Sequence, residues 1–374
     1  MRAVVYGNDH KLSLQEMPVP SCPRNGLLAK VHACAICGSD VKMFKAPDPR
    51  VKPPQIVGHE FVGEIVEVGS DAKGFAVGDR VVMATTLSCM ACPACWAGKT
   101  NLCPNVMPVS RAFPGAFAPC IAIPWEGIRA GNTVKVPSSL EDDGACLAEP
   151  LSCAVNAQQL AGVRTGHTVV VVGGGPLGAL NAELAKANGA TRVIVSQRSA
   201  TRQDLLRELD LDAVIDAASC DPVEEVKRLT NGRGADVVIV TAPDRTAQER
   251  ALEMACKGGM VNFFAGMSKD DPMVTINSRL VHYNEISITG GSDSTARHVE
   301  IAVGLLAAGR VNWKKIVTHR FPLSRFFDGM QVMLDRAGLK VVIKPSGGRP
   351  VETSRGLFKP REANGLCEEG LKTV

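Results

Sequence analysis

A valine-rich run, a glycine-rich turn and a helical pattern follow one another directly, and they constrain this chain more than any other feature. The turn fits G-x-G-x-x-G and contains Gly173, Gly175, Pro176, Leu177 and Gly178. In this motif the glycines permit a tight turn, close approach of backbone to a pyrophosphate, and close packing of helix on strand. The amides at the start of the helix then face the anion. This placement favours a dinucleotide site over a glycine-rich loop without function.

The pattern of the chain changes near residue 168. After it, six strand-like runs alternate with helical patterns, the strands at 168–173, 192–196, 213–216, 235–241, 259–265 and 285–290. This alternation predicts an α/β fold with a doubly wound parallel sheet. Before it, short apolar runs separated by Gly, Pro, Asn and Asp turns predict a β-rich unit over residues 1 to about 150.

These patterns divide the chain into two domains and a tail. We expect a β-rich domain formed by 1–153 together with 296–345, and a dinucleotide-binding domain formed by 154–295. The C-terminal part of the first domain contains a helical pattern at 299–309 and a β-like run at 339–344 that packs back on the N-terminal part. Residues 346–374 are polar, rich in Gly and Pro and without period, so we expect a disordered tail.

Composition excludes several classes of protein. Hydrophobic residues make up 45% of the 374 residues and the formal net charge is +4, so we expect a globular chain with neither a nucleic-acid nor a membrane partner. No run approaches the ~18 apolar residues that span a bilayer, and the first residues lack a signal-peptide core. The 13 cysteines, an odd number, then favour a reducing compartment, the cytoplasm, and free thiols.

The end of the second predicted strand bears on the choice of coenzyme. An NAD site carries Asp or Glu about 20 residues after the glycine turn, where it holds the ribose hydroxyls. This chain instead offers Ser196, Gln197 and Arg198, with Arg202 one helical turn later. These groups suit a 2′-phosphate, so we expect NADP(H) to be preferred over NAD(H). Alternatively, the two arginines form only a solvated start of a helix.

Four cysteines form a compact metal-binding pattern. Cys89, Cys92, Cys95 and Cys103 follow C-x2-C-x2-C-x7-C. Four thiolates close a tetrahedral shell around Zn²⁺ without an open position, which predicts a structural zinc. An iron–sulfur cluster uses similar ligands, and a nucleic-acid-binding zinc ribbon has similar spacing, but this loop carries a single lysine and no basic cluster.

A second, dispersed set of ligand types consists of Cys37, His59 and Glu149. One thiolate, one imidazole and one carboxylate leave a fourth position for water or substrate, as a catalytic zinc requires. Taken singly, each residue is as well explained as a buried thiol, a core histidine or a surface carboxylate. Their occurrence beside the cysteine tetrad and the dinucleotide turn favours a second zinc, hence two per chain.

Together these motifs resemble the zinc-containing medium-chain dehydrogenases over residues 1 to about 345. The stretch from Gly58 to Gly69, G-H-E-x2-G-x5-G, is similar to the family's zinc signature, and F-x-V-G-D-R-V from Phe75 and the cysteine tetrad follow in the family's order. The Glu-Pro-Leu-Ser segment at Glu149 resembles the branch of sorbitol, sugar-alcohol and threonine dehydrogenases.

The resemblance implies a GroES-like catalytic domain, a Rossmann domain and an active site between them. It implies that Cys37, His59 and Glu149 ligate the catalytic zinc, that Glu60 binds zinc or exchanges with water, that Ser39 begins a proton relay, and that Asp40 orients the histidine. It further implies hydride transfer between a nicotinamide coenzyme and an alcohol or ketone, by a homodimer or homotetramer.

The chain departs from the family at two places. Lys42 stands where relatives often carry His, and Gly290–Thr295 stands where sorbitol dehydrogenases carry Arg-Tyr in the substrate pocket. Pocket candidates are Lys42, Phe44, Arg111, Asp293 and Ser294. Two other interpretations remain: a medium-chain reductase that works without catalytic zinc, of the quinone or enone type, and a non-catalytic protein that binds zinc and nucleotide.

Overall fold

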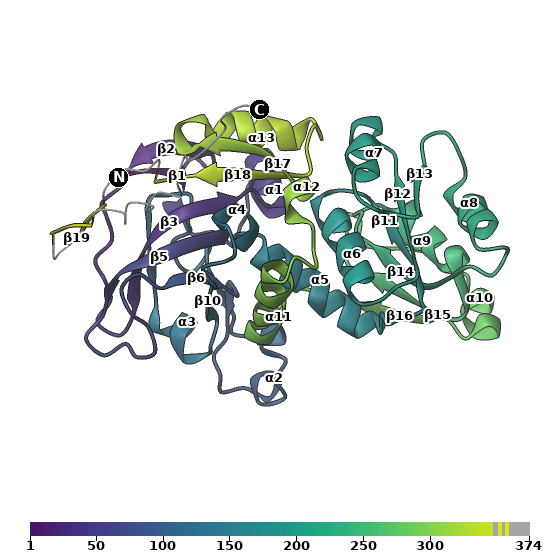
Figure 1. The fold of residues 1–374 in the computed structure, drawn as a ribbon, viewed down its shortest axis with the longest axis horizontal. Coiled ribbons are helices and arrows are strands. Elements are labelled where there is room, and N and C mark those ends of the chain that lie inside the picture. Colours follow the sequence, from purple (N-terminus) through teal and green to yellow (C-terminus); the bar gives the residue numbers. More distant parts are fainter. Residues whose placement is uncertain (347–350, 354–355, 359–374) are drawn as a thin grey trace, which may run out of the picture.

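The computed structural model describes residues 1–346, 351–353 and 356–358. Its strands gather in two large sheets that lie side by side, with helices between them and on their outer faces (Figure 1). The N-terminal third of the chain and the run near residue 340 belong to one body, and residues 168–290 form the other.

Six strands form the second sheet, in the order β13-β12-β11-β14-β15-β16. Their bounds are β11 Thr168–Val172, β12 Arg192–Gln197, β13 Ala213–Asp216, β14 Ala235–Val240, β15 Ala255–Phe263 and β16 Ser287–Gly290. All neighbours run parallel, which confirms the doubly wound sheet expected from the sequence. The strand order reverses beside β11, and the crevice at such a point is where ligands bind.

Helices cover both faces of this sheet because its strands are apolar on both sides. One face carries α5 (Ala148–Ala161), α6 (Pro176–Ala187) and α7 (Ala200–Arg207). The other face carries α8 (Pro222–Leu229), α9 (Arg245–Met254) and α10 (Ser278–Asn284).

The first body is built on a seven-stranded sheet with the order β10-β6-β5-β3-β18-β17, and β9 also pairs with β3. Its strands are β3 Leu27–Ala35, β5 Glu60–Val68, β6 Arg80–Met83, β9 Cys120–Ile123, β10 Thr133–Lys135, β17 Val317–Pro322 and β18 Lys340–Lys344. Because β18 pairs antiparallel with β3, the run near residue 340 joins the N-terminal sheet.

Shorter elements surround this sheet. They are β1 Arg2–Tyr6, β2 Leu12–Glu16, β4 Gln55–Ile56, β7 Thr86–Leu87, β8 Met107–Pro108, α1 Gly38–Lys45, α2 Pro93–Trp96, η1 Thr100–Leu102, α3 Trp125–Arg129, α4 Asp142–Ala145, α12 Trp313–Ile316, η2 Leu323–Arg325 and α13 Phe326–Leu334. The predicted helix at 299–309 is α11, Ala296–Ala307.

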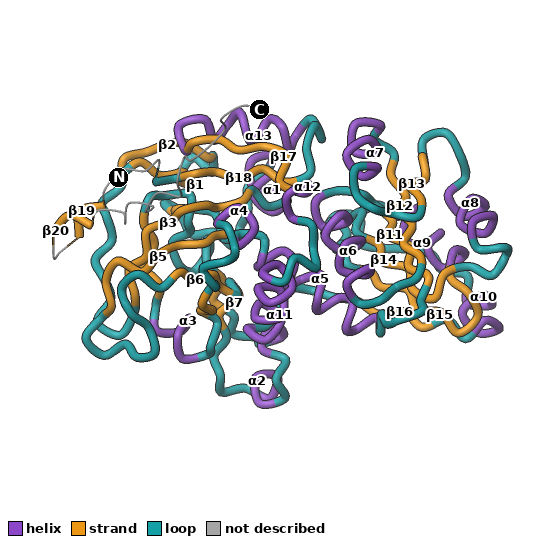
Figure 2. Tube along the Cα trace, in the orientation of Figure 1, coloured by secondary structure: helices purple, strands orange, loops and turns teal. Residues whose placement is uncertain are grey.

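Helices α5 and α11 pack against each other between the two bodies (Figure 2). The sequence analysis did not predict α5, which runs without interruption through the proposed domain boundary at 153/154. Both bodies therefore share this helix, and we retain the division into 1–153 with 296–345 and 154–295 as a proposal.

The tail contains regular structure that we did not expect. Val351–Thr353 (β19) and Gly356–Phe358 (β20) pair as antiparallel strands. The prediction of disorder was therefore wrong for these six residues, whose Val, Thr and Phe favour strands. Residues 347–350, 354–355 and 359–374 lie outside the described residues.

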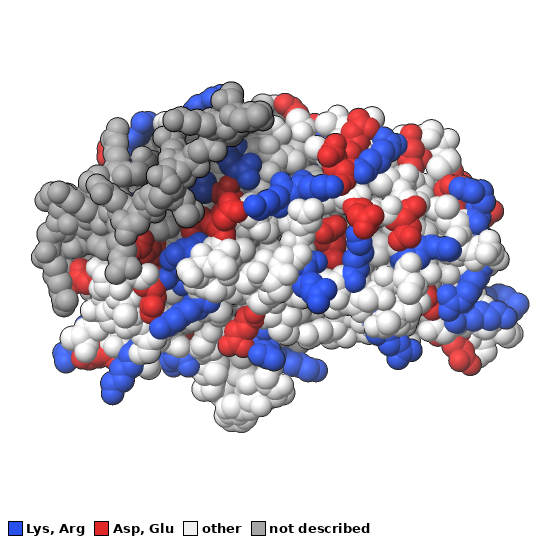
Figure 3. All heavy atoms as spheres, viewed as in Figure 1, with Lys and Arg blue, Asp and Glu red and all other residues white. Residues whose placement is uncertain are grey.

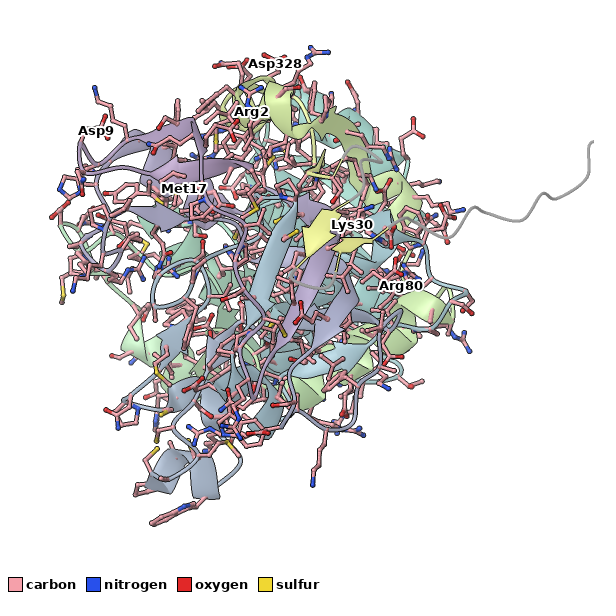
Figure 4. The ribbon with its side chains drawn as sticks, turned by 90° about the vertical axis from the view of Figure 1, so that its left-hand side faces the viewer. Arg2, Asp9, Met17, Lys30, Arg80 and Asp328 are labelled. Atoms are coloured by element: carbon pink, nitrogen blue, oxygen red, sulfur yellow. The ribbon has the colours of Figure 1, made fainter. Side chains whose placement is uncertain are left out.

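Charges of both signs are mixed on the face shown in Figure 3. Figure 4 views the first body from its side and labels Lys30 of β3 and Arg80 of β6. Within the described part of the chain, no helix has both the length and the apolar character needed to cross a membrane.

Candidate functional site

Antiparallel pairing of β3 with β5 brings the first ligand candidates together. Its register places Ala35 opposite Glu60, and β3 runs into Cys37, the residue that precedes α1. Gly58 has φ +98°, and a Cβ there would lie 2.7 Å from Phe117, so the turn before His59 requires glycine. Cys37 and His59, 22 positions apart in the chain, thus lie at the same end of the sheet.

Donor atoms of Cys37, His59 and Glu60 all lie within 4.8 Å of one another. A thiol, an imidazole and a carboxylate at this spacing fit a zinc ion with an open position. Burial raises the pKa of Cys37 to about 12, with Glu60 adding to the rise and Lys340 opposing it. A bound metal must therefore displace the thiol proton.

Glu149 stands in the first turn of α5 and is only 8% exposed. The Thr85 hydroxyl donates to its Oε1 at 3.3 Å. Burial raises the pKa of Glu149 to about 8, His59 opposes the rise, and Glu60 and Cys37 add to it. Glu149 is thus within electrostatic reach of the three donors but outside their compact group, whose carboxylate comes from Glu60, the other carboxylate that the resemblance implies as a zinc ligand.

Two neighbours of Cys37 support the group. The carboxylate of Asp40 accepts the Cys37 N–H at 2.9 Å through Oδ2, and Oδ1 lies 4.0 Å from His59 Nδ1. Asp40 is buried, which suits a residue that orients the imidazole. Ser39, two residues after Cys37, slightly opposes the rise in the pKa of the Cys37 thiol. Asp40 therefore lies beside both Cys37 and His59.

The sequence analysis missed Lys340. Its Nζ lies 2.6 Å from Oε1 and 2.5 Å from Oε2 of Glu60, and the two side chains are 3% and 1% exposed. The ammonium neutralises the Glu60 carboxylate beside the metal donors. Nothing in the sequence links two residues 280 positions apart, because only the β18–β3 pairing brings them together.

The cysteine tetrad forms the second donor group. Cys92 and Cys95 sulfurs lie 3.5 Å apart, as do those of Cys103 and Cys89, and all four lie within 4.8 Å. Tetrahedral Zn–S bonds of ~2.3 Å place sulfurs about 3.8 Å apart, so the lobe fits zinc. Pro93 starts α2 between the ligands.

The glycine turn fits a dinucleotide. Gly173 donates to the Ser196 carbonyl at 2.9 Å, and a Cβ at Gly178 would lie 1.9 Å from the Gly173 oxygen. Gly175 precedes α6, Pro176 occupies the first position of that helix, and Leu177 packs on the core. A helix start of this kind offers free backbone amides to an anion such as a pyrophosphate.

The groups after β12 are not equally free to bind phosphate. Gln197 Oε1 accepts the backbone amides of Arg198 and Ser199 at 2.7 and 3.1 Å, and Ser196 is buried. Arg198 NH1 lies 3.5 Å from Asp244 Oδ2. These three groups therefore already have partners or are shielded.

Arg202 remains without an acidic partner in the described part of the chain. One of its terminal nitrogens lies 3.5 Å from the Cβ position of Gly175, and its Nε donates to the Gly338 carbonyl at 3.4 Å. Burial lowers the pKa of Arg202, and the nearby Arg336 adds to the effect. An unpaired guanidinium over the glycine turn suits an anion.

The pocket candidates lie in three places. Lys42 and Phe44 are exposed on α1, and the Phe44 ring lies 6.2 Å from that of Phe327. Arg111 reaches Asp48 at 3.5 Å. Asp293 and Ser294 follow β16.

Comparisons with known proteins agree with this geometry. The chain matches the alcohol dehydrogenase GroES-like domain over residues 23–138 and the zinc-binding dehydrogenase domain over 176–307. It is 33% identical to an L-threonine 3-dehydrogenase of Bacillus licheniformis (89% of this chain, 95% of the relative) and 32% identical to a sorbitol dehydrogenase of Halalkalibacterium halodurans (92% and 99%).

A solved zinc-binding dehydrogenase of Sinorhizobium meliloti 1021, bound to NADP, has a TM-score of 0.84 at 29% identity and covers 92% of this chain and 99% of its own. Two domain matches in the family's order, and relatives one-third identical over nearly their whole length, show that the chain belongs to the zinc-containing medium-chain alcohol dehydrogenase family.

Proposed function

We propose that the protein oxidises a secondary alcohol of the polyol class to a ketone, with NADP as preferred hydride acceptor and two zinc ions per chain. Membership of the family makes it a zinc-dependent oxidoreductase acting on CH–OH groups. The grouping of Cys37, His59 and Glu60 near Glu149 carries the proposal.

Each residue of the group has a role in this proposal. Cys37, His59 and Glu60 hold the catalytic zinc, with Glu149 as a ligand that replaces Glu60 or joins it. Bound zinc supplies Lewis acidity to the alcohol oxygen. Ser39 takes the hydroxyl proton, and Asp40 keeps the imidazole in one orientation. Lys340 holds the Glu60 carboxylate when that carboxylate is not a ligand.

Arg202 supports the preference for NADP, since it lies over the glycine turn and no carboxylate follows β12 at residues 196–199. The pairing of Arg198 with Asp244 weakens the role that the sequence suggested for Arg198. The structurally similar dehydrogenase bound to NADP agrees with this choice.

Metal analysis and turnover together test the proposal. We expect two zincs per chain and oxidation of polyols in a panel of alcohols offered with each coenzyme. Cys37→Ala should abolish turnover and leave one zinc, whereas Cys92→Ser should lose the other zinc and lower thermal stability. Full activity of Cys37→Ala, or one zinc in the active wild type, would instead indicate a reductase that needs no catalytic zinc.

The cellular compartment and the oligomeric state are also proposals. Thirteen cysteines, with thiolate ligands among them, suit the reducing cytoplasm. Strand β16 ends its sheet with an open edge, which suits a homodimer or a dimer of dimers built by pairing that edge with a second copy.

A further inference from the structure

The short helix α4 leads directly into α5, the helix that carries Glu149 (Figure 1). Only Cys146 and Leu147 separate the two helices, and both have helical backbone angles. Leu147, the residue before α5, has no side chain that could accept a hydrogen bond from the helix start. The first turn of α5 is therefore held at its N-terminal side by α4 instead of by a capping side chain.

Asp142, the first residue of α4, binds two strands of the first sheet. Its Oδ2 lies 3.2 Å from Nδ1 of His32 on β3, and its Oδ1 accepts the Nε–H of Arg80 on β6 at 3.1 Å. Arg80 also donates to the Leu140 carbonyl, just before the helix, at 2.8 Å. The other ring nitrogen of His32 lies 3.4 Å from Oε2 of Glu64 on β5. This carboxylate thus connects α4 with β6 and β3, and through His32 with β5.

Asp143, the next residue, binds the other half of the same sheet. Its carboxylate forms ion pairs with Arg320 of β17 and Lys344 of β18, and its side chain is only 14% exposed. The strand order β6-β5-β3-β18-β17 places all these partners on neighbouring strands. Two adjacent carboxylates therefore attach one turn of helix across the width of the sheet.

A third contact holds α4 from the side of α12. A Cβ at Gly144 would lie 2.8 Å from the indole ring of Trp313, so the ring packs directly on the backbone of α4. Trp313 is buried. The helix is thus fixed both by its ion pairs with the sheet and by close apolar packing.

The strands that bind α4 also carry the metal donors. β3 runs into Cys37, β5 begins at Glu60 directly after His59, and β18 contains Lys340. Glu149, by contrast, comes from α5.

The Glu149 carboxylate has little of its own to hold it. Among the described residues its one hydrogen-bond partner is the Thr85 hydroxyl, at 3.3 Å. Its place relative to the other donors therefore follows the start of α5, and α4 joins that helix start to the strands of the donors.

We infer that Asp142 and Asp143 are positioning residues for Glu149: they fix the start of α5 on the strands that carry the other three donors. They thereby set how Glu149 approaches a zinc ion held by those donors. The inference rests on the proposed function, because it assumes a zinc at this site. Residues that orient metal ligands in this way change metal affinity or activity about ten- to a hundredfold when they are replaced.

The test measures the affinity of the zinc at this site by competition with a chelator. Asp142→Asn keeps the shape of the side chain and removes its charge. We expect it to weaken zinc binding at this site about tenfold, while the cysteine tetrad keeps its zinc. Cobalt in place of zinc distinguishes the two sites, because a site with one thiolate absorbs differently from a site with four.

Glu141→Gln is the matched control. Glu141 directly precedes Asp142 but pairs at 2.9 Å with Lys314 on the surface, where the two side chains are 63% and 67% exposed. This variant should leave the affinity of both zinc sites unchanged.

A double-mutant cycle separates positioning of Glu149 from a general structural role. In a Glu149→Gln background, Asp142→Asn should cause no further loss of zinc affinity, because its effect passes through Glu149. An equal loss in both backgrounds would overturn the inference. If Asp142→Asn does not fold, Lys344→Met, which removes a partly exposed partner of Asp143, takes its place in the cycle.

The same measurements distinguish the inference from the proposed function. A wild-type protein that holds zinc only at the tetrad would contradict the proposed function and the inference with it. Two zincs in wild type, together with wild-type affinity in Asp142→Asn, would contradict the inference alone.

Discussion

Among single residues, Arg202 is the one that we expect to contribute most to the preference for NADP over NAD. Its guanidinium has no acidic partner among the described residues and lies 3.5 Å from the Cβ position of Gly175. A charge-assisted hydrogen bond to phosphate contributes about 1.5–3 kcal/mol. Arg202→Ala should therefore raise the KM for NADP roughly ten- to a hundredfold and change that for NAD little.

Arg198→Ala is the comparison for this prediction. Because Arg198 is 63% exposed and paired with Asp244, its removal should cost less than that of Arg202. Steady-state kinetics with both coenzymes measure the difference. Equal losses with NAD and NADP in Arg202→Ala would mean that Arg202 binds the shared pyrophosphate instead of the 2′-phosphate.

His32 gives the protein a pH-dependent contribution to stability. Burial alone would lower its pKa, but Asp142 at 3.2 Å and Glu64 at 3.4 Å outweigh burial and raise the pKa to about 9. Arg80, labelled in Figure 4, also binds Asp142. The protonated imidazole therefore stabilises the fold fully below pH ~6.5, the unfolded pKa, and this stabilisation disappears as pH rises through about 9.

The shift sets an upper bound of about 3 kcal/mol on this contribution. His32→Gln should lower the free energy of unfolding at pH 6 and leave it nearly unchanged at pH 10. Urea unfolding at the two pH values measures the effect. A variant that loses equal stability at both would show that His32 acts through packing.

At the scale of elements, the packing of α6 on β11 depends on the absence of a side chain at Gly178. A Cβ there would meet the Gly173 carbonyl oxygen at 1.9 Å, and a backbone atom cannot yield as a flexible side chain can. Gly178→Ala should therefore displace the start of α6 and weaken both coenzymes by at least about tenfold, since the helix amides face the pyrophosphate.

Gly304→Ala provides the control. Gly304 lies inside α11 with nothing within 4 Å of its Cβ position, so alanine should keep coenzyme affinity and improve helix propensity. Fluorescence titration with NADH and NADPH compares the two variants. Unchanged affinity in Gly178→Ala would contradict the proposed position of the pyrophosphate.

At the scale of the whole molecule, the parallel sheet has two edge strands, β13 and β16. Among the described residues β16 pairs only with β15, and Ile288 on it is 37% exposed. Tyr283 and Met273 nearby in sequence are exposed at 63% and 72%. Unpaired edges with apolar side chains favour association. We therefore expect a dimer or tetramer by light scattering at micromolar concentration, and monomers from Ile288→Lys. A monomeric wild type would contradict this arrangement.

Much of the fold and the cysteine tetrad could be predicted from the sequence, because their signals are local. The alternation of strand and helix after residue 168, the glycine turn and the cysteine tetrad each lie within a short stretch. Helix α5 escaped prediction because 11 of its 14 residues are buried, so it shows no polar face with helical period.

Only the tertiary structure determines which polar and charged side chains lie within bonding distance of one another. The sequence determined the residue types of the site, since a thiolate, an imidazole and carboxylates are needed for zinc whatever the surroundings. The pairings of Lys340 with Glu60, of Arg198 with Asp244 and of Asn101 with the Ser292 carbonyl join residues 280, 46 and 191 positions apart. Such partners carry no periodicity or spacing in the chain, because strand order and helix packing alone set the distance between their polar groups.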